Sequence, residues 1–308
     1  MRKIIGIGET IMDIIFKNGQ PTAAVPGGSV FNGAITLGRL GQNVAMISET
    51  GNDRIGRMTL DFMAENGVDN SGVCVYHDGR TAISLAWLNE NNDAEYSFYK
   101  DYPKARLDVE WPVINPDDIV MMSSYFVLNP ALRPKVKEFL DYARKSGAII
   151  YYDVNFRSSH RDEAIKLYAD ILENFEYADI VRGSTEDFEN MFGSSDPAYI
   201  YNKEISFHCK NLICTDAGNA IRLFTPSLTD SYEVNKIETV STIGAGDNFN
   251  AGIIYGIMKE GILREDILSM TKEQWSRIIG HASALSAHVC QSFNNYISVE
   301  FAKEYMKK

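Results

Sequence analysis

The chain contains no long uninterrupted run of apolar residues. A membrane-spanning helix needs about 18 or more of them in succession, and no stretch of the 308 residues meets that requirement. The apolar start, MRKIIGIGETIMDII, is interrupted by Glu9 and Asp13, and no signal-peptide cleavage site follows it. We therefore expect a cytoplasmic protein that does not bind membranes.

Positive charge and paired cysteines are also scarce. The 30 Lys and Arg residues are outnumbered by 41 Asp and Glu residues, which gives a net charge of −11. Nucleic-acid binding depends on an excess of cations, so this balance argues against a nucleic-acid partner. The four cysteines form no CxxC pair and the five histidines are scattered. The spacing therefore favours neither a zinc site nor a disulfide.

What the chain does contain is an alternation of two hydrophobic patterns. Short apolar runs are separated by amphipathic stretches, which predicts an α/β fold with a mostly parallel sheet covered by helices on both faces. An apolar content of 45 % is ample for one large core. We expect strands at 3–9, 43–48, 118–124, 147–154, 178–184 and 211–216, and helices at 30–41, 55–67, 134–146, 161–174 and from about 185 onward.

Two segments break this alternation. Residues 73–100 contain the turn sequences HDGR and NENND with no helix between them, which predicts antiparallel strands. Residues 11–26 also look extended, with Asn18-Gly19 as a turn. Such strands could form a lid over a crevice at the carboxyl ends of the parallel sheet, and their edge could pair two chains into a homodimer. We expect an α/β domain of residues 1–10, 27–72 and 101–308, and a β-lid of residues 11–26 and 73–100.

The sequence TIGAGDNFNAG, residues 242–252, places three small residues directly before Asp247. Glycines let successive N–H groups point into one concavity, and a helix N-terminus adds about half a positive charge, so this segment suits an anion hole. A carboxylate beside it could take a proton from a hydroxyl that attacks a phosphoryl group. A helix that simply starts at glycine, with an acid that complements its dipole, explains the pattern equally well.

Other polar residues are candidates for binding a hydroxylated ligand. In PGGSVFNGA, residues 26–34, Gly27-Gly28 allows close approach of the backbone, and Asn32 offers a donor and an acceptor. Asp13 lies just beyond the first strand and could accept hydrogen bonds from vicinal hydroxyls. The sequence GIGETI lacks the third glycine and the following helix of a dinucleotide fingerprint, which disfavours a nicotinamide-dependent oxidoreductase.

The segments GGSVFNGAITLGRLG and TIGAGDNFNAG resemble the two signatures of the PfkB/ribokinase family of carbohydrate kinases, and the resemblance extends over essentially the whole chain. It implies a ribokinase-like fold with an inserted lid, and transfer of a phosphoryl group from ATP to a sugar hydroxyl with the help of Mg²⁺. By position, it implies that Asp247 is the general base. It further implies an anion hole of Gly244, Ala245 and Gly246, and sugar contacts from Asp13, Gly27, Gly28 and Asn32.

The resemblance also covers the nucleotide side, with three departures. STED stands where the family has N-x-x-E, a motif that helps to organise Mg²⁺ and phosphates, so Ser184 and Asp187 take those roles. CTDAGNA resembles the nucleotide-binding T-x-G segment through Thr215 and Gly218, while Ala217 departs from it or the loop is shortened. The family's D-T-x-G-A-G-D begins here with Ser241, and in many members that first acid helps to hold K⁺. A neutral oxygen attracts K⁺ less, so we expect weak or absent K⁺ stimulation.

Two further segments bear on the substrate. YSFYKD and DVNFR are similar to segments of fructokinases and 2-keto-3-deoxygluconate kinases, which implies sugar contacts from Lys100, Asn155 and Arg157. Arg157 could bind a carboxylate in bidentate fashion, but Lys100 replaces the usual lid arginine with a point charge. We favour a neutral ketohexose such as fructose.

The alternatives within the family are 2-keto-3-deoxygluconate and the substrates of other PfkB-type sugar and nucleoside kinases. An alternative of another class is a sugar-binding regulator that has lost its chemistry. The presence of Asp247 argues against a regulator, because binding alone does not require a base.

Overall fold

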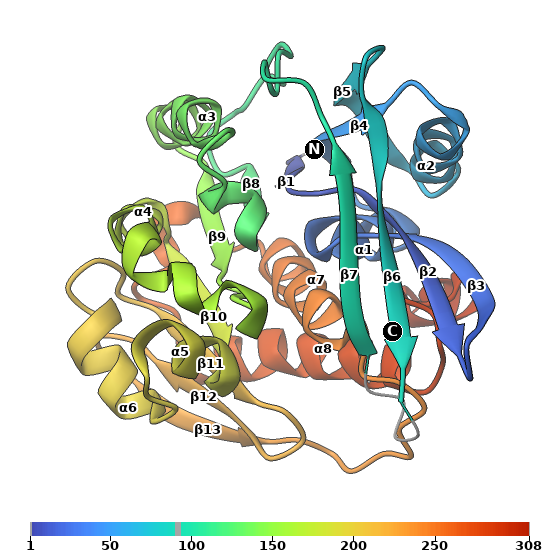
Figure 1. Cartoon of the computed structure of the whole chain (residues 1–308). Coiled ribbons are helices and arrows are strands. Elements are labelled where there is room, and N and C mark those ends of the chain that lie inside the picture. Colours follow the sequence, from blue (N-terminus) through green and yellow to red (C-terminus); the bar gives the residue numbers. More distant parts are fainter. Residues whose placement is uncertain (1, 90–93, 308) are drawn as a thin grey trace.

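A nine-stranded sheet forms the centre of the computed structural model, which describes residues 2–89 and 94–307 (Figure 1). The strand order is β13-β12-β11-β10-β9-β8-β1-β4-β5; the strands from β11 to β5 are parallel, and β12 and β13 add an antiparallel edge. The strands are β1 (Ile4–Ile7), β4 (Val44–Gly51), β5 (Val68–Tyr76), β8 (Ile119–Ser123), β9 (Ile149–Asp153), β10 (Ile180–Ser184), β11 (Leu212–Asp216), β12 (Ala220–Phe224) and β13 (Thr229–Glu233).

Successive residues of the central strands point into two separate cores, because side chains alternate across a sheet. Ile4 lies in one core and Ile5 in the other. The first face is covered by α1 (Ser29–Arg39), α2 (Arg54–Glu65), α7 (Ala245–Lys259), α8 (Lys272–Cys290) and α9 (Val299–Tyr305). The second is covered by α3 (Arg133–Lys145), α4 (Ala164–Tyr177), α5 (Thr185–Phe192) and α6 (Pro197–Ile200). The helices and parallel strands expected from the sequence are present.

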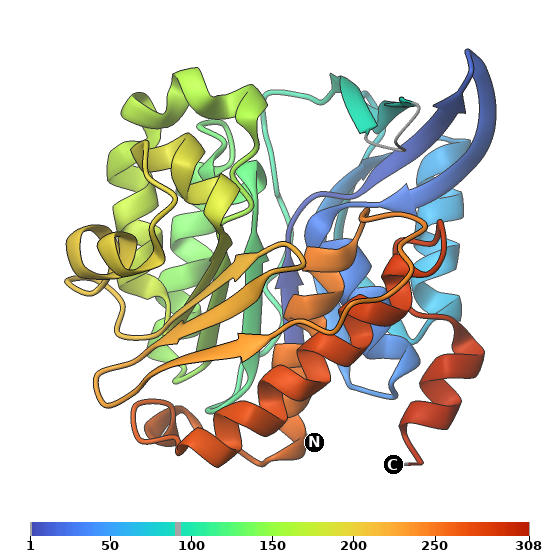
Figure 2. The same ribbon diagram turned by 90° about the horizontal axis from the view of Figure 1, so that it is seen from below.

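Helix α7 is buried along most of its length. A Cβ on Gly252 would lie 2.3 Å from the Cα atom of Ala282, and a Cβ on Gly256 would lie 2.9 Å from the Cα atom of Ile278. These two glycines therefore let α8 pack directly on the backbone of α7 (Figure 2). Among the described residues, no helix is long and apolar enough to cross a membrane.

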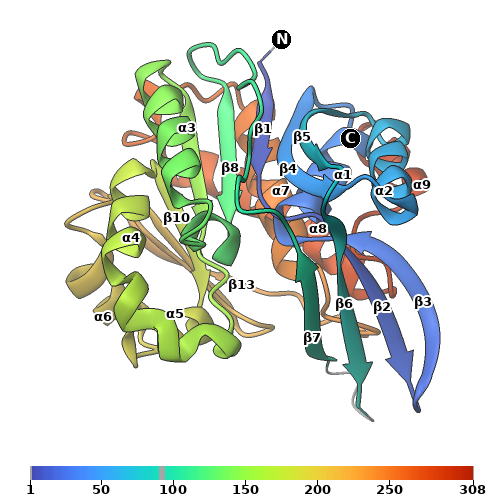
Figure 3. The ribbon, with the colours of Figure 1, turned by 45° about the horizontal axis from the view of Figure 1, so that its top comes forward.

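A second sheet of four strands, β3-β2-β6-β7, projects from the main sheet and forms the lid (Figure 3). Asn18 and Gly19, with φ angles of 53° and 72°, form the turn between β2 and β3. The β6 and β7 strands are also antiparallel, and the β2 and β6 strands pair in parallel, so the two excursions join into one sheet. The lid strands are β2 (Ile11–Lys17), β3 (Gln20–Gly27), β6 (Arg80–Leu88) and β7 (Ala94–Asp101).

The structure moves one lid boundary that the sequence predicts. Residues 73–76 belong to β5, which pairs in parallel with β4 in the main sheet, so the second lid segment begins at Arg80 instead of residue 73. Val73 and Tyr76 are buried there, and an isolated apolar strand does not reveal which sheet it joins. The NENND turn expected at residues 89–93 falls largely outside the described residues.

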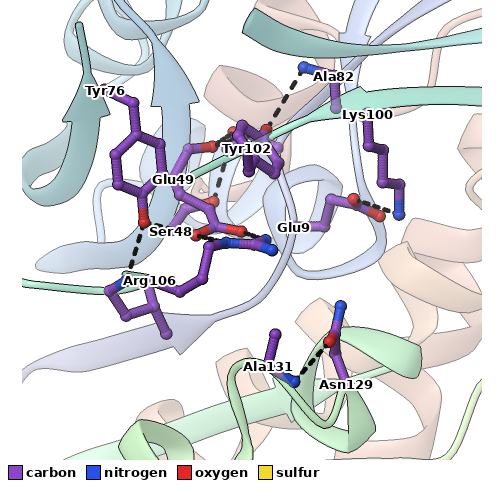
Figure 4. Close-up of polar contacts among 12 residues, drawn as sticks. Glu9, Ser48, Glu49, Tyr76, Ala82, Lys100, Tyr102, Arg106, Asn129 and Ala131 are labelled. Atoms are coloured by element: carbon purple, nitrogen blue, oxygen red, sulfur yellow. Dashed lines mark hydrogen bonds and ion pairs between the residues drawn. The ribbon is translucent and has the colours of Figure 1, made fainter. Parts of the chain in front are cut away.

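A buried ion pair anchors the base of the lid to the main sheet (Figure 4). Glu49 on β4 is 2 % exposed, and its carboxylate accepts hydrogen bonds from Nε of Arg106 at 2.8 Å and from the Tyr76 hydroxyl at 2.9 Å. Its backbone carbonyl accepts a hydrogen bond from Oγ1 of Thr10 at 2.8 Å. Thr10 precedes β2 and Arg106 follows β7, so two passages of the chain between lid and main sheet meet at Glu49.

Replacement of Arg106 should therefore destabilise the fold. Arg106→Met leaves the Glu49 carboxylate buried without its counter-charge, and we expect the free energy of unfolding in urea to fall by about 3–5 kcal/mol. The double variant Glu49→Gln/Arg106→Met should recover much of that loss, because no unpaired charge remains. Arg54→Met, at an exposed position, is the control. A loss below about 1 kcal/mol in Arg106→Met would contradict the anchor.

Candidate active site

The carboxyl ends of three parallel strands converge on the N-terminus of α7 through one buried arginine. Arg182 on β10 donates from Nη1 to Oδ1 of Asp153 at 2.9 Å and from Nη2 to Oγ1 of Thr215 at 2.7 Å. A Cβ on Gly246 would lie 3.2 Å from Nη1, and the guanidinium lies 5.6 Å from the ring centre of Phe249. A fixed positive charge thus lies directly against the first turn of α7.

The first turn of α7 has the geometry of an anion hole. Gly244 caps the helix with φ 76°, and a Cβ there would lie 2.6 Å from the backbone oxygen of Asn295, so a larger residue is excluded on both grounds. The first N–H groups of a helix have no acceptor within the helix. The Ala245 N–H donates to the backbone oxygen of Thr242 at 3.2 Å, and the N–H groups of Gly244 and Gly246 lie with the positive end of the helix dipole beside Asp247.

Asp247 lies in the first turn of α7 and is bound by Asn32 of α1, whose Nδ2 donates to its Oδ2 at 2.8 Å. Burial raises the pKa of Asp247 to about 6, against the hydrogen bonds from Asn32 and Ser29 and the positive charge of Arg157. A carboxylate with such a pKa is mostly ionised at neutral pH but still has appreciable proton affinity. Those properties suit a general base.

A chain of hydroxyl groups links the surroundings of Asp247 to Arg182. The Oγ atoms of Ser29 and Ser123 lie 2.8 Å apart, and the Ser123 hydroxyl donates to Oδ2 of Asp153 at 3.1 Å. Sequence reasoning missed Ser123, Asp153 and Arg182 as members of the site. The signal that could have found them is position, since Ser123 and Asp153 are the last residues of β8 and β9.

On the lid side, Asp13 lies close to the same site. Its carboxylate accepts a hydrogen bond from the Ser84 hydroxyl on β6, and a Cβ on Gly27 would lie 2.3 Å from its Oδ2. Burial raises the pKa of Asp13 to about 6, against the Ser84 hydrogen bond, and the charge of Asp247 raises that pKa further. The structure therefore brings Asp13, Gly27, Asn32 and Asp247 together, as the sequence predicts.

Lys100 is held in an ion pair next to Gly28, with a carboxylate whose charge acts on Asp13. Its Nζ lies 2.6 Å from Oε1 of Glu9, and the two side chains are 37 % and 22 % exposed (Figure 4). Gly28, with φ 127°, allows the chain to pass here, since a Cβ would lie 2.1 Å from the Glu9 backbone oxygen. Glu9 is a fourth residue that sequence reasoning did not place in the site.

The predicted nucleotide side lies along the same edge of the sheet. Ser184 on β10 lies opposite Thr215 on β11. Ser184 and Asp187 form a capping box at the start of α5, in which the Ser184 N–H donates to Oδ2 of Asp187 at 2.7 Å and the Asp187 N–H donates to Oγ of Ser184 at 3.1 Å. Gly218 lies further out, in the exposed turn between β11 and β12. The Asp187 carboxylate therefore already accepts hydrogen bonds within this cap.

The DVNFR segment follows β9 into the site. Asn155 is half-buried and adopts φ 40°, an uncommon backbone conformation that often marks functional positions. The side chain of Arg157 is exposed, and its charge acts on Asp247. These positions place Arg157 near the predicted base.

Known proteins share this whole architecture. A fructokinase from Vibrio cholerae O395, solved with fructose, ADP and calcium ion, superimposes with a TM-score of 0.84 at 18 % identity over 99 % of each chain. The aminoimidazole riboside kinase from Salmonella enterica, solved with aminoimidazole riboside and an ATP analogue, gives a TM-score of 0.80 at 19 % identity over 99 % of each chain. The expected ribokinase-like fold with a separate lid is therefore confirmed.

Sequence comparison adds the family. Probable fructokinase-7 from Arabidopsis thaliana is 25 % identical over 278 residues, which cover 85 % of this chain and 81 % of the relative. Fructokinase-1 from Zea mays is 26 % identical over 277 residues, which cover 83 % of each protein. The model of the pfkB family of carbohydrate kinases matches residues 1–301. This chain therefore belongs to the pfkB family and is an ATP-dependent sugar kinase.

Proposed function

We propose that this kinase phosphorylates a neutral ketohexose, with fructose as the preferred acceptor. The observation that carries the proposal is the ion pair between Lys100 and Glu9 beside Gly28. A carboxylate on the acceptor, as in 2-keto-3-deoxygluconate, would have to compete with Glu9 for Lys100, which leaves Arg157 as the other cation of the sugar side. Several relatives named as fructokinases support the same choice.

The other acids of the site favour the same class of substrate. Asp13 and Asp247 lie close enough for the charge of Asp247 to raise the pKa of Asp13, whereas the charge of Glu9 is compensated by Lys100. A negatively charged acceptor would be repelled by these groups, whereas neutral hydroxyls can donate hydrogen bonds to them. Such repulsion gives selectivity without any additional contact to the preferred sugar.

In the proposed reaction, Asp13, Gly27, Gly28 and Asn32 bind the sugar, and Asp247 takes the proton of the attacking hydroxyl. The N–H groups of Gly244 and Gly246, joined by that of Ala245 when it gives up its hydrogen bond to Thr242, stabilise the charge on the transferred phosphoryl group, assisted by Arg182 behind them. Asp187 would be the protein ligand of Mg²⁺ if its carboxylate exchanged the hydrogen bonds of the α5 cap for the ion, which would supply positive charge to the phosphates of ATP. Ser184, Thr215 and Gly218 line the nucleotide side, and Lys100, Asn155 and Arg157 complete the sugar side.

The lid also supports the proposal of a homodimer. Its face away from Asp13 carries the stacked rings of Phe16 and Trp87, 4.3 Å apart, and the exposed Tyr99. Trp87 is 40 % exposed and Tyr99 is 56 % exposed, so their apolar surface is available to a second copy of the chain.

Sedimentation of the wild type and of Trp87→Ser tests the proposed dimer. We expect a dimer for the wild type and a shift to monomer for the variant.

Removal of the base should separate activity from stability. Asp247→Asn should keep sugar binding but lose about 10²–10⁴-fold in kcat.

The same variant has a predicted effect on stability. Because the pKa of Asp247 is raised by folding, its ionised form destabilises the fold, and the wild type loses stability as pH rises through about 6. Asp247→Asn should therefore have the higher Tm at pH 8, with little difference near pH 4. Asp61→Asn, at an exposed position, is the control, and near wild-type turnover in Asp247→Asn would show that the base is wrong.

A substrate panel tests the choice of sugar. ADP release with fructose should exceed ADP release with 2-keto-3-deoxygluconate in the wild type. Glu9→Gln frees Lys100 and should raise the ratio of kcat/KM for the keto acid to that for fructose by about 10-fold, in line with one recovered charge interaction. Arg157→Lys should reduce any keto-acid activity of the wild type, because lysine cannot bind the carboxylate in bidentate fashion. Wild-type preference for the keto acid would overturn the proposal.

The K⁺ response remains a prediction from Ser241. Its hydroxyl is buried and accepts a hydrogen bond from the Ile243 N–H at 3.2 Å, so it offers K⁺ a neutral oxygen that is already engaged. We expect an active enzyme with weak or absent stimulation when K⁺ replaces an organic cation at constant ionic strength. Ser241→Asp should then create K⁺ dependence. Strong saturable activation of the wild type would contradict this expectation.

A further inference from the structure

Asn295 occupies a rigid position beside the active site. It lies in the loop between α8 and α9 and is 1 % exposed. Two residues further on, the backbone of Ile297 makes two hydrogen bonds to α1. Its carbonyl oxygen accepts from Nη1 of Arg39 at 2.6 Å, and its N–H donates to Oγ1 of Thr36 at 3.3 Å. The loop therefore holds Asn295 in place from the main domain.

The backbone and the side chain of Asn295 contact different halves of the site. Its backbone oxygen accepts from Nδ2 of Asn248 on α7 at 2.8 Å and lies against Gly244, where a Cβ would approach to 2.6 Å. Its side-chain Nδ2 donates to Oδ2 of Asp13 at 3.4 Å, and a Cβ on Gly27 would lie 3.3 Å from that nitrogen. One residue thus spans the anion hole and the acid of the lid.

The side chain of Asn295 makes this contact at the expense of its own oxygen. Oδ1 of Asn295 is buried and has no hydrogen-bond partner among the described residues. Nδ2 faces Asp13 because the amide oxygen would be repelled by the carboxylate. A buried acceptor without a partner is unfavourable, so an apolar residue of similar size would serve a purely structural role better. The amide is therefore explained by the carboxylate that it contacts.

We infer that Asn295 is a positioning residue for phosphoryl transfer, which holds the Asp13 carboxylate of the lid in register with the anion hole at Gly244. The inference rests on the proposed role of Asp13 in sugar binding. The distance of 3.4 Å is long for a hydrogen bond in the absence of a sugar, and such contacts commonly tighten when the substrate binds. A sugar held by Asp13 would then present its hydroxyl to Asp247 in a fixed position.

The amide also affects the charge of Asp13. Ser84 and Asn295 donate hydrogen bonds to its carboxylate, and Glu9 and Asp247 are the acids that act on it. Tyr296, whose pKa is raised to about 12 chiefly by burial, lies next in the chain and stays neutral near pH 7. A donor stabilises the ionised carboxylate, so loss of the Asn295 amide raises the pKa of Asp13 further. The acidic limb of the pH profile should then move to higher pH.

The test is Asn295→Leu, which keeps the approximate volume and removes the donor. With the sugar that the wild type phosphorylates best, KM for the sugar should rise about 10-fold while KM for ATP changes less than about 2-fold, the loss expected for one hydrogen bond to a charged group. The acidic limb of kcat/KM for the sugar should shift upward. Asn294→Leu, at the exposed neighbouring position, is the matched control and should change neither quantity.

A double variant separates positioning from a general structural effect. In an Asp13→Ala background, Asn295→Leu should add almost nothing to KM for the sugar, because its partner is gone. An equal additional rise in that background, or an unshifted acidic limb, would overturn the inference. If Asp13→Ala itself leaves KM for the sugar unchanged, the proposed sugar role of Asp13 fails first. Asn295→Asp supplies a second variant of nearly identical shape, and it should move the acidic limb upward even more.

Discussion

The structure depends on backbone contact between α7 and α8, because that contact fixes where the N-terminus of α7 lies. Gly252 and Gly256 bring the two helix axes together over a stretch where any side chain would collide with α8. The start of α7 is consequently held against Arg182 and Asn295 instead of being free to tilt. An anion hole made of backbone N–H groups is only as precise as the helix that carries it, so this packing is a precondition of the chemistry.

Arg182 supplies a positive charge among the buried acids near the N-terminus of α7. Burial would lower the pKa of Arg182, but the negative charges of Asp153 and Asp187 and the hydrogen bond to Asp153 outweigh burial, so its pKa is raised and the guanidinium stays charged. The acids of the site are thereby partly compensated before the nucleotide arrives. A buried arginine in two hydrogen bonds also restrains β9, β10 and β11 relative to one another. In the proposed mechanism, the alignment of the anion hole and the packing of the strand ends therefore depend on the same arginine.

The parts that could be read from the sequence are those encoded locally. Gly244 and Asp247 are three residues apart, and a glycine entry with an acid in the first turn has a direct physical meaning. The parallel strands are visible because each is a continuous apolar run. Arg182 and Asn295 were missed because their partners, Asp153 and Asp13, are distant in sequence, and only the fold brings them together. The last residues of β5 were assigned to the lid for a similar reason, because the sequence of one strand does not show which other strand it pairs with.

The lid and the main domain each contribute one carboxyl group with a raised pKa to the site. Asp13 arrives with the lid and Asp247 with α7, and the pKa of each is about 6, chiefly through burial. Neither is therefore at an electrostatic optimum in the protein alone. Sugar hydroxyls that donate to Asp13 would relieve one group, and proton transfer to Asp247 would relieve the other. In the proposed reaction, the free energy stored in these two sites would be released by binding and by chemistry, which would explain why the fold tolerates acids that it would be more stable without.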